Sequence, residues 1–114
     1  MIVCLTGGTP KAGKEEELAS IFAEIEASLR VAPGFISSED LTTERGEDVT
    51  VLRFETEAHL ASWRDSAPHG SYLDVVQDYY ESFWVQVATV YREYRWRDGT
   101  RTDGDLSAMF REQT

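Results

Sequence analysis

The sequence is poor in the residues that build disulfides and metal centres. Cys4 is the only cysteine among the 114 residues, so no disulfide can form within one chain. We interpret it as a small buried residue of a strand. His59 and His69 are the only histidines. Because their spacing matches no common zinc pattern, we expect no metal.

Long apolar runs and basic residues are also scarce. No run approaches the roughly 20 residues that a helix needs to cross a bilayer, and the first apolar run is too short for a signal peptide. The sequence therefore predicts a soluble cytoplasmic protein. Only 11 Lys and Arg stand against 21 Asp and Glu, which gives a formal net charge of −10. This charge repels phosphate backbones and anionic lipids, so neither nucleic acid nor a membrane is an expected partner.

What remains is the composition of one folded domain. A chain of 114 residues that is 41% hydrophobic suits a single core. Apolar residues at intervals of three and four predict helices, and runs rich in Val, Ile, Tyr and Trp predict strands. Thr56 is the expected N-cap of the second helix. In chain order the pattern predicts a strand over 2–6 ended by the Gly and Pro of 7–10, a helix over 14–31, strands over 35–44 and 48–55, helices over 57–64 and 71–83, and a strand over 84–96.

This order, β-α-β-β-α-β, is typical of a ferredoxin-like α+β fold with an antiparallel sheet. We expect the domain to cover residues 1–97 and a C-terminal tail to cover 98–114, with at most one helical turn at 106–111. The last strand, 84–96, is largely apolar or aromatic on both faces. A single small domain covers only one face of its sheet, so we expect a homodimer packed sheet against sheet.

One short stretch, residues 59–72, holds both histidines. If residues 57–64 are helical, His59 and Trp63 lie four residues apart on one face. A proline and a glycine then place His69 in a loop, near Tyr72. The stretch would thus bring two imidazoles close to a flat aromatic surface.

Five segments carry a family resemblance. They are Ala32-Pro33-Gly34-Phe35, Val51-Leu52-Arg53-Phe54-Glu55, Leu60-Ala61-Ser62-Trp63-Arg64, Pro68-His69 and Tyr79-Tyr80-Glu81-Ser82-Phe83. With them the chain resembles the antibiotic biosynthesis monooxygenase family of dimeric α/β-barrel proteins. The resemblance implies a homodimer that oxidises an electron-rich aromatic small molecule, such as an anthrone-type phenol, to a quinone. It implies molecular oxygen as co-substrate and neither metal nor flavin.

The resemblance also aligns the candidate site residues. Trp63 matches a helix Trp in the pocket of members that oxidise anthrone-like polyphenols, whereas His59 and His69 stand where those members have Asn and Tyr. Haem-degrading members carry a Trp in the third strand where this chain has Phe54. Haem is therefore the less favoured alternative.

Oxygenation without a metal or flavin needs a base, an aromatic clamp and a cation for the substrate anion. Histidine titrates near neutrality, so His69 is the preferred base and His59 the second candidate. Tyr72 would donate a hydrogen bond to a substrate carbonyl. The expected substrate-binding residues are Trp63, which would stack on the ring, Arg92, which would face the negative charge, Phe54 and Tyr80.

Other interpretations of the same residues stay open. The scaffold could carry a cyclase, isomerase or decarboxylase that does not use oxygen, or a binding dimer without chemistry. His59 could be a surface residue, His69 could only stabilise its loop, and Trp63 could belong to the core.

Overall fold

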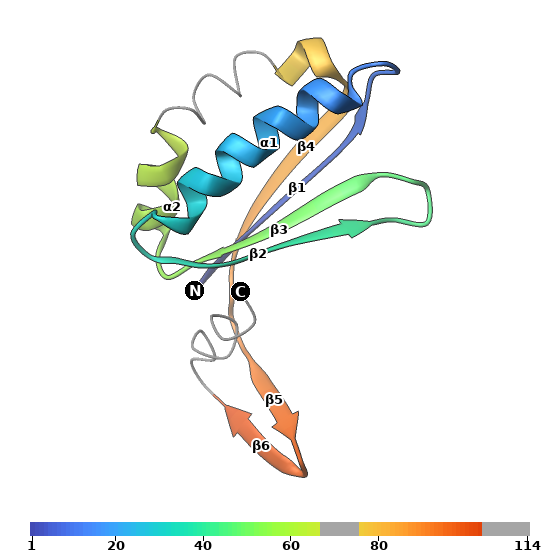
Figure 1. The fold of residues 1–114 in the computed structure, drawn as a ribbon. Coiled ribbons are helices and arrows are strands. Elements are labelled where there is room, and N and C mark those ends of the chain that lie inside the picture. The colour runs from blue at the N-terminus through green and yellow to red at the C-terminus, as the bar shows by residue number, and fades with distance from the viewer. Residues whose placement is uncertain (67–75, 104–114) are drawn as a thin grey trace.

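The computed structural model describes residues 1–66 and 76–103, and the statements below concern these residues. Four strands form an antiparallel sheet in the order β2-β3-β1-β4, and β5 pairs with β6 in a separate hairpin. This is the expected ferredoxin-like α+β fold (Figure 1). The elements are β1 (Ile2–Pro10), α1 (Glu15–Arg30), β2 (Phe35–Thr42), β3 (Asp48–Phe54), α2 (Glu57–Arg64), β4 (Tyr80–Thr89), β5 (Tyr94–Arg97) and β6 (Thr100–Asp103).

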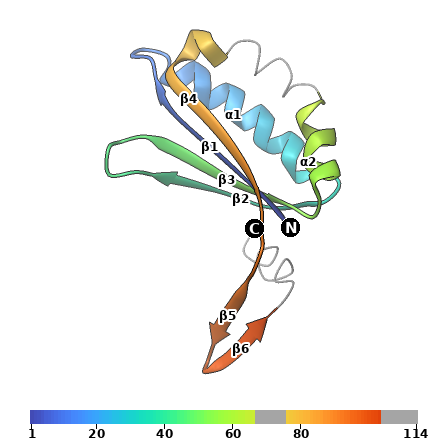
Figure 2. The ribbon, with the colours of Figure 1, turned by 180° about the vertical axis from the view of Figure 1, so that it is seen from behind.

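Both helices lie on the same side of the sheet, as the opposite views in Figures 1 and 2 show. The core forms between them and the sheet. The other face of the sheet carries no helix in the described part of the chain, and we call it the open face. The main buried residues of the core are Ile2, Cys4, Leu18, Ile25, Leu29, Leu52, Phe54, Leu60, Trp63, Val76 and Tyr80.

The two helices match their predicted ranges to within a residue. Three glutamates occupy the first turn of α1, where the helix dipole favours negative charge. Thr56 caps α2 as expected, because its hydroxyl accepts the backbone N–H of His59 at 3.2 Å. Neither helix is both long and apolar enough to cross a membrane.

The first strand is longer than predicted. It continues through Gly7 and Gly8 to Pro10, where a turn was expected. The indole of Trp84 lies over Gly7 and the ring of Tyr80 lies over Gly8, so a Cβ at either glycine would overlap a ring. The glycines therefore make room for the aromatic residues of β4 rather than ending the strand.

The last predicted helix and strand were placed wrongly. Residues 76–79 are helical, but the strand begins at Tyr80 and ends at Thr89, and residues 90–93 interrupt it before β5. The first residues of the predicted tail are part of a hairpin. Its turn, Asp98-Gly99, has positive φ at both positions, which is the geometry of a type I′ hairpin turn. The predicted helical turn at 106–111 lies outside the described residues.

Candidate functional site

Trp63 lies at the point where α2 meets the rest of the core. Its side chain is 5% exposed. The indole N–H donates to the hydroxyl of Ser28 on α1 at 3.0 Å, and that hydroxyl donates to the carbonyl of Ile25 at 2.6 Å. The polar atom of the buried indole is thus satisfied, and α2 is fixed against α1.

Three aromatic rings stack between the sheet and α2. Phe54, the last residue of β3, is fully buried, and its ring centre lies 5.9 Å from that of Trp63. Phe35 meets Phe54 edge to face at 5.8 Å. A bulge between Phe35 and Ser37 shifts the register there, and it leaves Phe35 paired with Phe54 on the helix side of the sheet. We call Phe35, Phe54 and Trp63 the aromatic layer.

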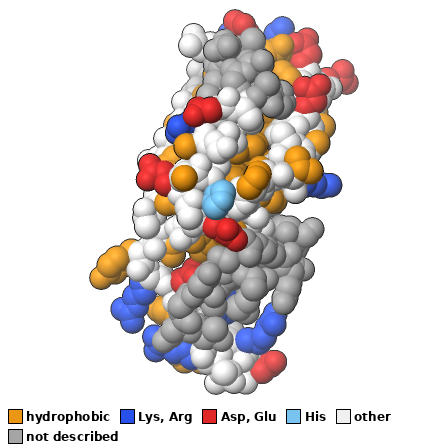
Figure 3. Space-filling model, turned by 90° about the vertical axis from the view of Figure 1, so that its left-hand side faces the viewer, with side chains coloured by type: hydrophobic (Ala, Val, Ile, Leu, Met, Phe, Trp, Pro, Cys, Tyr) orange, Lys and Arg blue, Asp and Glu red, His pale blue; other side chains and the backbone are white. Residues whose placement is uncertain are grey.

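His59 lies beside this layer, at the start of α2. Its ring packs over Gly34, whose φ of +79° suits glycine. Its Nδ1 lies 2.8 Å from the Thr56 hydroxyl, while Nε2 has no hydrogen-bond partner within 1–66 and 76–103. The half-buried imidazole is therefore held at one nitrogen and available at the other. It is the pale blue side chain in Figure 3, which shows both hydrophobic and acidic side chains beside it.

A proton at His59 has two possible positions. If Nδ1 carries it and donates to Thr56, then Nε2 offers a lone pair and can act as a base. If the Thr56 hydroxyl donates instead, then Nε2–H can donate to a substrate oxygen. Either state is chemically useful at a site that binds a phenol or an enol.

Cysteine chemistry does not fit this site. Burial raises the pKa of the Cys4 thiol above its ordinary value of 9.0, and the positive charge of Arg64 offsets part of that effect. The thiol is therefore protonated near neutrality and a poor nucleophile. In the described residues, no three His, Cys, Asp or Glu side chains are grouped so that they could hold a metal ion.

The structure does not bring Tyr80 to the aromatic layer. Tyr80 is the first residue of β4 rather than a helix residue, and it pairs with Pro10, whereas Phe54 pairs with Ile2. The two positions are eight residues apart along β1, or about 26 Å at the rise of a strand. Tyr80 is buried against Phe83, with ring centres 5.1 Å apart, at the far end of the sheet.

Arg92 was predicted to lie on the last strand, and this prediction was wrong. It lies in the segment that joins β4 to β5. Its guanidinium lies 5.7 Å from the ring centre of Tyr94. Two other predicted site residues, His69 and Tyr72, lie outside the described residues. Their roles stay predictions.

Two residues that position the candidate site were not identified from the sequence. Ser28 accepts the hydrogen bond of the Trp63 indole, and Gly34 lies under the ring of His59. Ser28 follows Ile25 by three residues, next to the apolar stripe of α1, and a hydroxyl so close to a core is a signal for a buried polar partner. Gly34 stands in the segment Ala32-Pro33-Gly34-Phe35, which the sequence marked only as part of the family resemblance. No pattern in the neighbouring residues predicts that the imidazole of His59 packs on Gly34.

Proteins with this fold carry out many different activities, so the fold alone does not identify the family of this chain. Comparison with known proteins does identify it. The family model described as antibiotic biosynthesis monooxygenase matches residues 1–75. The chain therefore belongs to the antibiotic biosynthesis monooxygenase family, as its sequence segments suggested. No curated protein matches it closely enough to serve as a relative.

Solved structures confirm the fold. Protein SO0527 from Shewanella oneidensis is 24% identical with a TM-score of 0.69, over 76% of this chain and 87% of that one. Rv0793 from Mycobacterium tuberculosis is 18% identical with a TM-score of 0.73, over 81% and 96%. A structure named antibiotic biosynthesis monooxygenase is 11% identical with a TM-score of 0.69, over 79% and 98%.

Proposed function

We propose that the protein is a cofactor-independent monooxygenase that oxidises an electron-rich aromatic small molecule, of the phenol or anthrone type, to a quinone. Membership of the family supports this activity. One structural observation carries it: the imidazole of His59, held by Thr56, stands at the start of the helix whose Trp63 completes the aromatic layer. A base and an aromatic side chain for the ring are two of the three elements that such a substrate needs, the third being a cation for its anion.

The reaction balances without a further reductant. A base removes the acidic proton of the substrate, and the resulting anion passes one electron to O₂. The two radicals combine to a hydroperoxide at the substrate carbon. Loss of water then leaves a new carbonyl, so a CH₂ group and O₂ become C=O and H₂O.

Within this scheme His69 is the preferred base and His59 the second candidate. Tyr72 donates a hydrogen bond to the substrate carbonyl. Trp63 is the proposed stacking partner of the substrate ring, and the fully buried Phe54 supports Trp63 from the side of the sheet. Tyr80 takes no part, because it lies about eight strand residues from Phe54.

The proposal includes a homodimer that covers the open face. Val3, Leu5 and Val51 lie on this face by the register of the sheet, and Leu41 on the same face is 52% exposed. The same face also carries the ion pair of Arg53 and Glu39. A sheet face with these apolar side chains and no covering helix favours association, and a second copy supplies a matching face by symmetry.

Oxygen uptake tests the function. We expect the wild-type protein to consume one O₂ for each anthrone oxidised, and His69→Ala to lose most of this rate. His59→Ala should lower the rate about tenfold or more if His59 is the base or orients it. Ser20→Ala, an exposed change on α1, is the control. Oxygen uptake that is unchanged in both histidine variants would overturn the assigned roles.

The burial of Trp63 favours a second candidate, a binding dimer without chemistry. The indole N–H already has Ser28 as its partner, so Trp63 needs no ligand to satisfy it. Binding of anthrone without oxygen uptake would support this candidate. Turnover in the strict absence of oxygen would instead support a cyclase, isomerase or decarboxylase, and a Soret shift on adding haem would support a haem protein.

A further inference from the structure

The proposed reaction needs a cation for the substrate anion, and Arg92 is the residue predicted for that role. Arg92 lies in the segment that follows β4, where its guanidinium stands 5.7 Å from the ring centre of Tyr94. Arg64 is a second candidate within the helix layer. It is the last residue of α2 and directly follows Trp63 of the aromatic layer. A positive charge therefore stands next to the side chain that is proposed to stack on the substrate.

The helix directs Arg64 toward the sheet. Arg64 stands four residues after Leu60, and residues at this interval lie on the same face of a helix. Leu60 is buried in the core, so this face of α2 packs against the sheet. The charge of Arg64 also reaches the thiol of Cys4 on the helix-facing side of β1. The half-exposed guanidinium thus lies at the edge of the core, on the side of α2 that faces β1.

Beside Cys4 the sheet carries apolar side chains that stay half exposed. In the register of β1 and β4, Cys4 pairs with Val87 and Thr6 pairs with Val85. Paired residues of antiparallel strands project to the same face, so both valines lie on the helix-facing side. Yet Val85 is 49% exposed and Val87 is 50% exposed, whereas Cys4 is buried. The helix-facing side of β4 is therefore an apolar surface that a ligand can reach, next to the strand on which the charge of Arg64 acts.

The protein itself engages Arg64 only weakly. Within residues 1–66 and 76–103 its one ion pair is with the neighbouring Asp65, at 3.5 Å from Nε. The carboxylate of Asp65 is largely exposed, and exposed pairs of this kind contribute little. The guanidinium has five N–H donors, so most of them stay available for a ligand.

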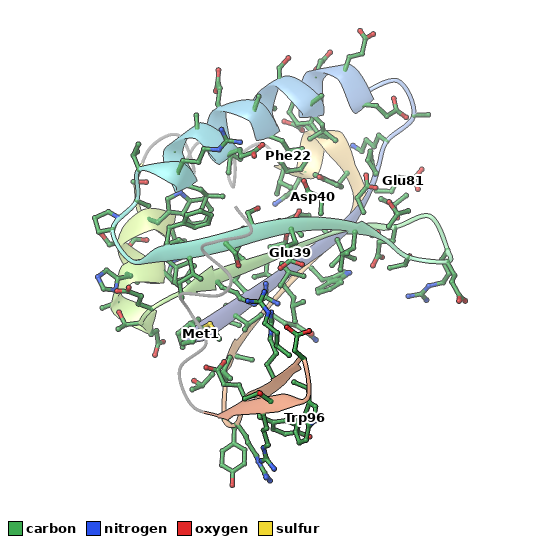
Figure 4. All side chains as sticks on the ribbon, turned by 60° about the horizontal axis from the view of Figure 1, so that its bottom comes forward. Met1, Phe22, Glu39, Asp40, Glu81 and Trp96 are labelled. Atoms are coloured by element: carbon green, nitrogen blue, oxygen red, sulfur yellow. The ribbon has the colours of Figure 1, made fainter. Side chains whose placement is uncertain are left out.

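Two other arginines of the helices and sheet already have close acidic partners. Arg53 pairs with Glu39 at 2.6 Å on the open face. Figure 4 shows Glu39 on the opposite side of the sheet from Phe22 of α1. Arg30, at the end of α1, pairs with Glu26 at 2.8 Å. Neither arrangement leaves a cation as weakly held, on the helix-facing side of the sheet, as Arg64.

We infer that Arg64 binds the oxyanion of the deprotonated substrate, with the apolar part of the substrate against Val85 and Val87. The inference rests on the proposed function and supplies the cation that it needs. A guanidinium is charged at every pH at which proteins are folded, and it presents a planar fork of donors to an oxygen anion. Next to an apolar surface its attraction for the anion exceeds the value in water, so Arg64 favours the ionised substrate over the neutral phenol. Asp65 competes for the guanidinium and limits this preference.

The dye 2-hydroxyanthraquinone tests the contact without turnover. It is already a quinone, and its phenol changes colour on ionisation, so absorption spectra of the protein-bound dye give the pKa of the bound phenol. We expect the wild-type protein to lower this pKa by about 1–3 relative to the free dye. Arg64→Gln should abolish most of the decrease, and Arg64→Lys should retain part of it because the charge remains. Asp65→Asn should enlarge the decrease, because it removes the competing carboxylate.

Two further arginine variants serve as comparisons. Arg45→Gln removes the same charge at the exposed turn between β2 and β3, and it should leave the pKa of the bound dye unchanged. A larger loss in Arg92→Gln than in Arg64→Gln would transfer the role to Arg92 and overturn the inference. The same pKa of the bound dye in wild type and Arg64→Gln would overturn it, and so would a dye that stays unbound at about 100 μM protein.

Oxygen uptake with anthrone separates this inference from the proposed function. A pKa of the bound dye that is lowered in wild type and restored in Arg64→Gln, in a protein that takes up no oxygen, would support the anion site and overturn the monooxygenase. Oxygen uptake by a protein in which Arg64→Gln leaves the pKa of the bound dye unchanged would support the monooxygenase and overturn the role of Arg64.

Discussion

The indole N–H of Trp63 donates to the hydroxyl of Ser28, 3.0 Å away and 35 residues earlier in the chain. This bond joins the two helices above the sheet and sets the orientation of the indole against Phe54. The aromatic layer is therefore held in place before any substrate arrives. Such preorganisation is what a site for a flat molecule requires.

Removal of the Ser28 hydroxyl should destabilise the fold. In Ser28→Ala the N–H of Trp63 is left buried without this acceptor, at a cost of about 1–3 kcal/mol. Urea unfolding followed by tryptophan fluorescence measures the change. Ser20→Ala makes the same chemical change at an exposed position of α1 and should stay within about 0.5 kcal/mol of the wild type. Equal stabilities of the two variants would show that the bond contributes nothing.

Gly34 should tolerate no side chain. Gly34→Ala combines a positive φ with overlap between the new Cβ and the ring of His59, whereas Gly46→Ala has a similar φ of +80° and no neighbour within 4 Å. Both variants should lose about 1–2 kcal/mol from backbone strain, and Gly34→Ala should lose more. Thermal unfolding measures the difference.

The double variant Gly34→Ala/His59→Ala separates the two causes. Without the imidazole ring, the cost of Gly34→Ala should fall but stay above that of Gly46→Ala, because the Cβ of residue 59 still lies 2.7 Å from the new Cβ. A double variant that shows purely additive losses would contradict the proposed packing of His59 on Gly34.

Gly7 should also tolerate no side chain, because an aromatic ring lies over it. The indole of Trp84 lies over Gly7, and its N–H donates to the carboxylate of Glu47 at 3.1 Å. Gly7→Ala should displace the ring and break this bond, which shifts tryptophan emission to longer wavelength. Gly13→Ala is the control, since no atom lies within 4 Å of its Cβ position. An unchanged emission spectrum would contradict this placement of Trp84.

Stability should fall at alkaline pH because of Cys4. The thiol of the unfolded chain ionises near 9.0, but burial raises the pKa of Cys4 in the folded chain. The unfolded state therefore releases its proton first, and stability is lost as pH rises through 9 toward the raised value. Urea midpoints between pH 7 and pH 10 should show this decline. Cys4→Ala should reduce this decline in the urea midpoint. An equal decline in both proteins would contradict the raised pKa of Cys4 in the folded chain.

The regular parts of the fold could be predicted because they obey local rules. The apolar stripe of α1 and the threonine cap of α2 fix those helices within a few residues. The end of β1 could not be predicted, because Gly7 and Gly8 are turn residues by local preference and become strand residues only when Trp84 and Tyr80 lie on them.

The part of the candidate site that lies on α2 could also be predicted from local rules. The spacing of His59 and Trp63 on α2 follows from helix geometry, and both lie where that spacing places them. The distance of Tyr80 from Phe54 depends on the register between β1 and its neighbours, which no local pattern contains. Arg92 was misplaced because the strand pattern runs on through residues 90–93 without a visible break.

Oxygen labelling of the product tests the central claim most directly. Anthrone is oxidised by the full-length protein under ¹⁸O₂, and the mass of the quinone is measured. The proposed reaction places one ¹⁸O atom in the new carbonyl and the other in water, so the quinone should gain one label. A quinone without ¹⁸O, or a rate that is the same without O₂, would contradict the assignment of this protein as a monooxygenase.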